Sequence, residues 1–167
     1  MKMLSTQLTG LFQRIAKQEE AIEDIARVLA QAAVGEGTIF LAAFGEMKAV
    51  AAAALYGAEP LASVAEWQPD SIVNSVDRVF ILAKNDEGDE LAGRLTDANI
   101  PFAMLCAESK ETDLADAFIS LGIDKGLLPA EDGGRTVVPH ALAALYVYHA
   151  VKMTIDEMLE ALLSSVR

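Results

Sequence analysis

The chain has 167 residues and a mass of 17.8 kDa, about the size of one ordinary domain. Hydrophobic residues make up 53% and charged residues 23% of the sequence, a balance that excludes intrinsic disorder. The 13 basic and 25 acidic residues leave a formal charge of −12, which argues against nucleic acid and against anionic membrane surfaces as partners. We therefore expect one folded domain over residues 1–167.

The cysteine content and the lengths of the apolar runs indicate the cellular compartment of the protein. A lone cysteine, Cys106, can form neither an internal disulfide nor a cysteine metal cluster, so a reducing compartment is expected. Every apolar run is too short to span a bilayer, and the first five residues lack the hydrophobic stretch of a signal peptide. These features predict a cytoplasmic protein.

The first predicted element is a long amphipathic helix between Leu4 and Ala33. Its apolar residues recur at three- and four-residue steps, and Gly35 and Gly37 follow at its expected end. A helix of this length exceeds the globular average. Part of its apolar stripe is therefore expected to meet another chain, or else to pack along the protein's own sheet, and the sequence leaves both alternatives open.

Five apolar runs follow, typical of strands buried on both faces of a parallel sheet. They cover residues 38–43, 60–64, 78–83, 101–106 and 117–120. Helices are expected over residues 46–56 and 88–99, with a short polar turn at 112–116. Two closing helices are expected over residues 138–153 and 155–163, with Thr154 as N-cap of the second. Strands that alternate with helices predict a doubly wound α/β fold.

Two loops follow predicted strands and carry polar residues. Ligands of doubly wound sheets bind at the carboxyl ends of the strands, so these loops are expected to line the site. The first loop contains Phe44, Gly45 and Glu46, and the second contains Lys84, Asn85, Asp86, Glu87 and Gly88.

Several segments, in a fixed order along nearly the whole chain, carry a family resemblance. They are the leading helix, Phe40-Leu41-Ala42-Ala43-Phe44-Gly45, residues 77–82 before Gly88, residues 95–105, and Leu114-Ala115-Asp116. This order resembles the sugar isomerase (SIS) domains, and the phosphoheptose isomerases in particular. The resemblance implies a three-layer αβα sandwich of flavodoxin-like or Rossmann-like type, with a five-stranded parallel sheet. It also implies a homodimer or homotetramer, and we expect no cofactor.

The resemblance further implies a phosphosugar ligand. SIS domains hold phosphosugars through Ser and Thr hydroxyls in the loops after the first and third strands, whereas this chain has Glu46 and an acidic stretch around Glu87 there. An ionised carboxylate cannot donate a hydrogen bond, and it repels a phosphate by about 1 kcal/mol at 4 Å in water. A phosphate bound in the family's usual way is therefore not expected.

Three interpretations of these acidic residues remain open. Glu46, Asp89 and Glu90 fall in first turns of predicted helices, where negative side chains stabilise the helix N-terminus. Alternatively, Glu46, Asp86 and Glu87 converge on Mg²⁺ or Ca²⁺, although we predict no metal site. A third alternative is a ligand that carries an amine.

One catalytic residue is implied by the resemblance. Phosphoheptose isomerases use a glutamate on the helix after the first loop as base and a histidine on a late helix. Here the matching helix positions in residues 47–56 are alanines, whereas His140 falls on the histidine position. His140 is the candidate catalytic residue, with an ordinary packing role as the alternative, and His149 is expected to be structural. The sequence leaves open whether this chain retains the aldose–ketose isomerisation of the family.

A glycine-containing loop before His140 adds Arg135 and Thr136 as candidate ligand-binding residues. A guanidinium can grip a phosphate with two hydrogen bonds. Alternatively, Arg135 pairs with Glu131 or Asp132 and only tethers the loop. The sequence thus predicts a divergent phosphosugar-binding protein, with a non-catalytic regulatory or structural dimer as the alternative.

Overall fold

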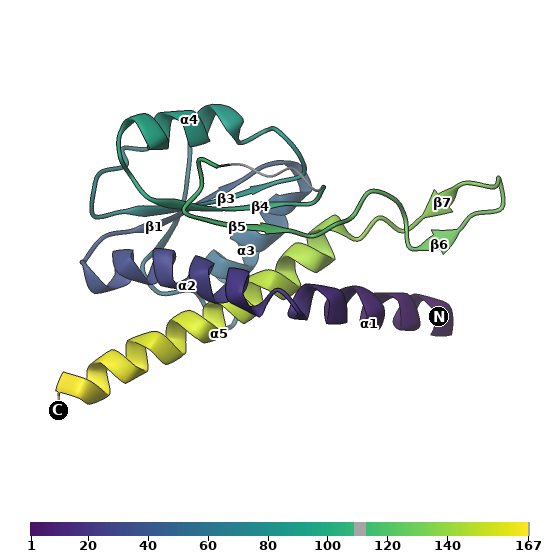
Figure 1. Ribbon diagram of the computed structural model, residues 1–167, viewed down its shortest axis with the longest axis horizontal. Helices are drawn as coiled ribbons and strands as arrows, with labels where there is room; N and C mark the ends of the chain where they lie inside the picture. The colour runs from purple at the N-terminus through teal and green to yellow at the C-terminus, as the bar shows by residue number, and fades with distance from the viewer. Residues whose placement is uncertain (109–112, 167) are drawn as a thin grey trace.

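A five-stranded parallel sheet forms the centre of the computed structural model, which describes residues 1–108 and 113–166 (Figure 1). The strand order is β2-β1-β3-β4-β5, and every neighbouring pair is parallel. The strands are β1 (Ile39–Ala43), β2 (Val64–Glu66), β3 (Arg78–Ala83), β4 (Phe102–Cys106) and β5 (Ala117–Ser120). The predicted fold class is confirmed.

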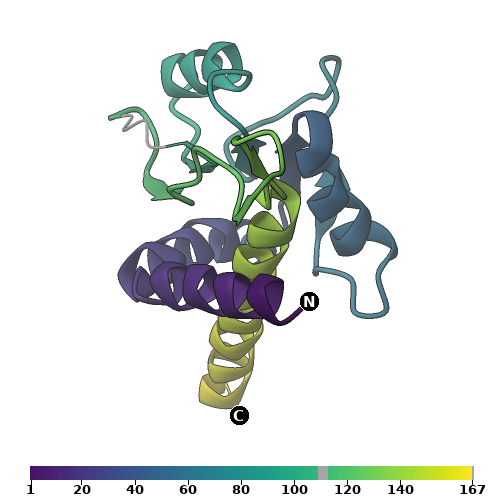
Figure 2. The ribbon, with the colours of Figure 1, turned by 90° about the vertical axis from the view of Figure 1, so that its right-hand side faces the viewer.

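Helices cover both faces of the sheet, as the continuous apolar strands predicted (Figure 2). One face carries α2 (Glu19–Val34), α3 (Lys48–Tyr56) and α5 (His140–Val166), and the opposite face carries α4 (Asp89–Asp97). Alternate residues of β3 divide between the two layers, with Phe80 and Leu82 on the first face and Val79 and Ile81 on the second. No helix of the described residues is long and apolar enough to span a bilayer.

The N-terminal region is helical, but the prediction of one continuous helix was wrong. Two helices form, α1 (Lys2–Ala16) and α2, and the chain breaks between them at Gln18, whose φ and ψ are −87° and 42°. The Gln18 side chain donates a hydrogen bond of 2.9 Å to the carbonyl of Ser120, which ties the break to the end of β5. As a result, α2 packs on the sheet, whereas α1 leaves it and lies beside α5 (Figure 1).

The prediction of two closing helices was also wrong, because α5 runs unbroken from His140 to Val166. The Thr154 hydroxyl does not cap a helix; it donates to the carbonyl of Ala150 at 2.8 Å, a bond that leaves the helix intact. The last turns of α5 extend beyond the sheet (Figure 1).

Two further boundaries differ from the predictions. The second strand begins at Val64 rather than at residue 60, because Leu61 is buried and donates its N–H to the carbonyl of Ala54, closing the turn after α3. A two-stranded antiparallel hairpin, β6 (Leu128–Pro129) and β7 (Arg135–Thr136), was not predicted, and it projects from the body (Figure 1). The predicted turn at 112–116 lies partly outside the described residues.

Candidate functional site

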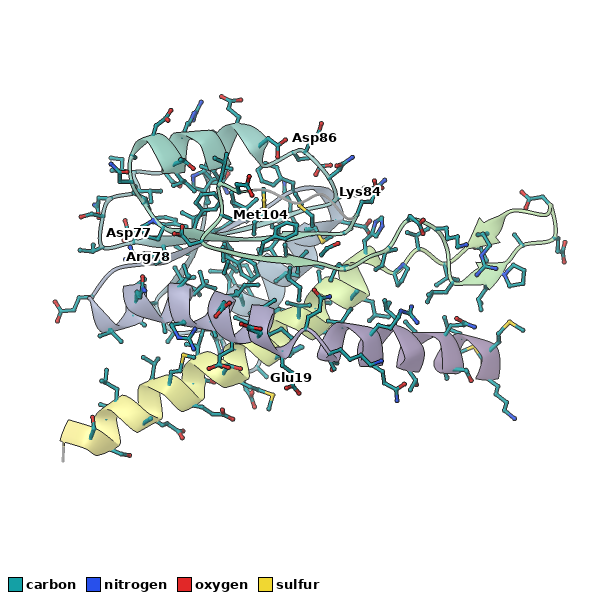
Figure 3. The ribbon with its side chains drawn as sticks, viewed as in Figure 1. Glu19, Asp77, Arg78, Lys84, Asp86 and Met104 are labelled. Atoms are coloured by element: carbon teal, nitrogen blue, oxygen red, sulfur yellow. The ribbon has the colours of Figure 1, made fainter. Side chains whose placement is uncertain are left out.

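The candidate site lies at the carboxyl edge of the sheet. The chain leaves β1 and enters a short 3₁₀ helix, η1 (Gly45–Met47), which continues into α3, and it leaves β3 and enters α4. The N-terminal turn of α5 packs against η1. Figure 3 labels Lys84 and Asp86 at this edge and Asp77 and Arg78 at the opposite edge of the sheet. Both predicted loops therefore lie at the expected end.

The first loop turns sharply at Gly45. This residue has a φ of +59°, a left-handed conformation that favours glycine, and a Cβ added there would meet no atom within 4 Å. The turn closes with a 3.1 Å hydrogen bond from the N–H of Met47 to the carbonyl of Phe44, and Met47 is buried beneath it. The backbone at the start of the helix is therefore open on one side.

Glu46 and His140 form the central contact of the site, although 94 residues separate them. The Nδ1 atom of His140 lies 3.2 Å from Oε1 of Glu46; the imidazole is 5% exposed and the carboxylate 54% exposed. The other ring nitrogen, Nε2, is buried and has no hydrogen-bond partner within residues 1–108 and 113–166. With Nδ1 protonated towards the carboxylate, Nε2 of the neutral ring is an acceptor, and in the doubly protonated ring it is a donor.

In the second loop, the carboxylate of Glu87 accepts hydrogen bonds from the backbone of the loop itself. Oε2 of Glu87 accepts hydrogen bonds from the N–H groups of Lys84 and Asn85, both at 3.0 Å. Two amides that an incoming anion would need are therefore already bonded to an internal anion. This is a local structural role for an acidic residue of the loop, different from the first-turn role that we considered for Glu46, Asp89 and Glu90.

Gly88 is required for packing between α4 and the sheet. A Cβ at this position would overlap Cγ2 of Ile81 and would lie 3.5 Å from Cε of Met104. The glycine thus lets the N-terminus of α4 approach the sheet closely. A hollow of about 180 Å³ beside it is lined in part by Phe44 and Trp67, whose ring centroids are 6.3 Å apart.

The structure does not support the cation-site interpretation of the acidic loops. Among residues 1–108 and 113–166, no three His, Cys, Asp or Glu side chains gather closely enough to hold a metal ion. Glu46 is turned to His140 and Glu87 to the backbone of its own loop. The three carboxylates considered for Mg²⁺ or Ca²⁺ do not converge.

Arg135 and Thr136 lie in the projecting hairpin rather than in the two loops. The Arg135 guanidinium donates from Nε to the carbonyl of Gly126 at 3.0 Å and from Nη2 to the carbonyl of Leu127 at 2.9 Å. Asp132, considered as an ion-pair partner, accepts the N–H of Gly134 instead. Arg135 therefore tethers the hairpin, as the second alternative held, but through backbone carbonyls.

The sequence identified His140 and Glu46 separately but did not predict their contact. No spacing rule connects residues so far apart, and the contact arises because α5 begins where η1 ends the first loop. Nor did the sequence predict that Tyr148, eight residues further along α5, is buried with its hydroxyl unpartnered among the described residues.

Solved structures share this fold at low sequence identity. A provisionally assigned sugar-phosphate isomerase from Listeria monocytogenes superposes with a TM-score of 0.68 and 13% identity, covering 93% of this chain and 86% of that one. The protein MJ1247 from Methanococcus jannaschii, for which a 3-hexulose-6-phosphate isomerase function was inferred, superposes with a TM-score of 0.60 and 9% identity, covering 94% and 89%. At these identities the similarity establishes the fold alone.

Sequence comparison gives the family. The uncharacterized protein YwjG of Bacillus subtilis (strain 168) is 34% identical over 169 residues, covering 96% of this chain and 98% of that protein. The model of a domain of unknown function, DUF2529, matches residues 1–159. The chain therefore belongs to the DUF2529 family.

Proposed function

We propose that this chain is a divergent SIS-type protein that binds a phosphosugar or a related carbohydrate derivative at the carboxyl edge of its sheet. The observation that carries the proposal is the buried imidazole of His140, with one nitrogen held by Glu46 and the other without a partner in the part of the chain that the structure describes. An unsatisfied buried polar group costs about 1–3 kcal/mol. Because Nε2 is buried, an oxygen atom of a ligand would satisfy it after the groups that cover it move aside, at the edge where doubly wound sheets bind ligands.

The ligand's anionic group would bind at the first loop, whose carboxylate, Glu46, is directed to His140, rather than at the second. The N–H groups at the start of a helix lack intrahelical partners and attract anions, and η1, which begins at Gly45 and leads into α3, opens on an unobstructed turn. At the second loop, Glu87 already accepts the N–H groups of Lys84 and Asn85. A sugar hydroxyl or carbonyl oxygen would then face His140, while Glu46 fixes the orientation of the imidazole ring.

We propose that isomerisation in the manner of the phosphoheptose isomerases is not retained. That reaction needs a carboxylate held beside the carbon that loses its proton. The α3 positions that correspond to the family's base are alanines, and Glu46, the carboxylate nearest to His140 among the contacts described, is bonded to the imidazole. Binding without turnover is the expected activity.

A non-catalytic regulatory or structural role without a phosphosugar is the second candidate. The bonds from Lys84 and Asn85 to Glu87 favour it, because the internal carboxylate already accepts two N–H groups of this loop and repels a second anion. The two candidates differ in one measurable respect, the response of the protein to sugar phosphates.

Calorimetric titration and thermal melting with sedoheptulose 7-phosphate, glucose 6-phosphate and the corresponding unphosphorylated sugars test the proposal. We expect a sugar phosphate to bind, and to stabilise the fold by about 2.7 kcal/mol at a hundredfold excess over its Kd. Glu87→Ser should tighten binding, because it removes a negative charge from the loop next to the proposed site. His140→Ala should abolish binding, and Asp97→Asn, at the exposed C-terminal end of α4, should leave it unchanged.

Two outcomes would refute the proposal in favour of the second candidate. The first is the absence of binding or stabilisation by any sugar phosphate, in the parent protein and in Glu87→Ser alike. The second is binding that His140→Ala and a conservative His140→Gln variant both retain at the parent affinity, since the imidazole would then have no part in the site.

A further inference from the structure

The hollow beside Gly88 lies where the strand order of the sheet reverses. The chain runs from β1 to β2 on one side and then crosses to β3, β4 and β5 on the other. In doubly wound sheets of this order, ligands bind in the crevice between the carboxyl ends of the first and third strands. Phe44 follows β1 and Glu87 lies in the loop after β3, and both line the hollow. The hollow is therefore at the position where the topology favours a ligand.

Trp67 and Phe44 give the hollow an aromatic wall, which Pro69 continues. Trp67 is the first residue after β2, and its N–H donates a 2.9 Å hydrogen bond to the carbonyl of Leu41 in β1. The two rings are tilted by 45° to each other and pack against the core on the α4 face of the sheet. Both side chains are only half-buried. The wall is therefore held in place by the core while part of it stays accessible.

The rest of the lining is mostly charged, and these charges already have partners. Nη2 of Arg94 lies 2.7 Å from Oε1 of Glu90, and Glu87 accepts two backbone N–H groups. A phosphate in the hollow would meet two carboxylates, and a cation would have to compete with Arg94 for Glu90. The ion pair still offers an acceptor oxygen beside further N–H donors. This combination matches uncharged hydroxyl groups, which both donate and accept hydrogen bonds.

The size of the hollow limits the part of a ligand that it can hold. Its volume is about 180 Å³, whereas pockets that enclose a drug-sized ligand measure about 300–1,000 Å³. The hollow therefore has room for one small ring rather than for an extended molecule. A closed sugar ring has the matching surfaces, because it carries C–H groups on its faces and hydroxyl groups around its edge.

We propose that the hollow binds the closed ring of the sugar, with a C–H face of the ring on Trp67 and its hydroxyl groups on Glu90 and Arg94. This inference rests on the proposed function and names the form of sugar that the site selects, the ring rather than the open chain. The negative face of an aromatic ring attracts C–H groups, and the contact buries apolar surface. Phe44 directly precedes Gly45, so the hollow adjoins the turn proposed for the anionic group.

Titrations followed by calorimetry and by tryptophan fluorescence test the inference, because Trp67 is the single tryptophan of the chain. The probes are glucose 6-phosphate, 1,5-anhydroglucitol 6-phosphate, whose ring cannot open, and glucitol 6-phosphate, which has no ring. We expect the two ring probes to bind with similar Kd and to change the Trp67 emission, and glucitol 6-phosphate to bind about tenfold more weakly or worse. Trp67→Leu should raise the Kd of the ring probes by about tenfold, and Trp67→Phe by less than about threefold.

Tyr56→Leu, at the 83% exposed last residue of α3, is the matched control and should leave the Kd unchanged. Equal affinity for the ring-locked and open-chain probes overturns the inference, as does an unchanged Trp67 emission on binding or parent affinity in Trp67→Leu. In these cases a sugar phosphate still binds, so the proposed function stands. If no probe binds, the proposed function and this inference fall together. The probe comparison and the emission use the parent protein, so they decide the matter even if Trp67→Leu does not fold.

Discussion

At the residue scale, two acidic side chains of the candidate site bond to the protein's own groups. Glu46 contacts His140, and Glu87 accepts two backbone N–H groups of its loop. Their position after the strands could be predicted from the sequence, because apolar runs and glycines define where the strands end. Their partners could not, since a carboxylate in a loop can equally stabilise a helix N-terminus, bind a cation or bond to a neighbouring amide.

Two glycines of α4 give opposite predictions. Gly88→Ala should lower the free energy of unfolding by about 1–3 kcal/mol, because its Cβ would overlap Ile81 in a packed region. Gly93→Ala should raise it by about 0.5–1 kcal/mol, since Gly93 lies inside the helix and a Cβ there meets nothing within 4 Å. Urea unfolding of both variants measures the difference. Equal effects of the same sign would contradict the packing role of Gly88.

The buried phenol of Tyr148 should make the free energy of unfolding depend on pH. Burial raises the pKa of its phenol above the ordinary value of 10.0, and the carboxylates of Asp156 and Glu59 add to the shift. Above about pH 10 the unfolded chain loses this proton first, so the phenol's contribution is complete at lower pH and is lost as the pH rises through its folded pKa.

Tyr148→Phe isolates this contribution. Its hydroxyl has no partner among the described residues, so the variant should be as stable as the parent at pH 7, or more stable by about 1 kcal/mol. Between about pH 9.5 and 11 it should lose less stability than the parent. Tyr56→Phe, at an 83% exposed position, is the control. A parent and a Tyr148→Phe variant with parallel stability curves across this range would contradict the account.

At the scale of the elements, strands were easier to predict than helix ends. Continuous apolar runs identify strands buried on both faces, and four of the five predicted runs coincide with strands to within one residue. The break at Gln18 depends on a contact with Ser120, about a hundred residues away, which no local pattern shows. The helix α5 is unbroken for a local reason. The hydroxyl of Thr154 donates to the carbonyl of the preceding turn, so this threonine does not have to begin a new helix.

Asp77 joins two elements at the amino edge of the sheet, opposite the candidate site (Figure 3). Its carboxylate is 6% exposed and accepts the N–H groups of Thr38, before β1, and Asn74, before β3, both at 2.9 Å. Asp77→Ala should therefore destabilise the fold by about 2–3 kcal/mol in chemical denaturation. Asp116→Ala removes one bond, from Phe102, at an exposed side chain, and should cost less. The reverse ranking would contradict this interpretation.

At the scale of the whole molecule, the fold places two different surfaces on one chain. The carboxyl edge of the sheet brings Glu46 to His140. The break at Gln18 directs α1 away from the sheet, beside a groove between α2 and α5 that Glu19, Glu23 and Glu157 help to line. The sequence predicted the sheet and the excess length of the N-terminal helical region. It could not predict which residues come together at each surface, because both surfaces depend on the path of α5 past η1, α1 and α2.

The most direct test of the account is the nitrogen NMR spectrum of the two histidines, with and without sedoheptulose 7-phosphate. The chain contains only His140 and His149, so His149 is an internal reference. We predict that the sugar phosphate changes the Nε2 resonance of His140, because this nitrogen gains a hydrogen bond, and leaves the His149 resonances unchanged. An unchanged His140 spectrum at saturating sugar phosphate would contradict the proposed ligand site.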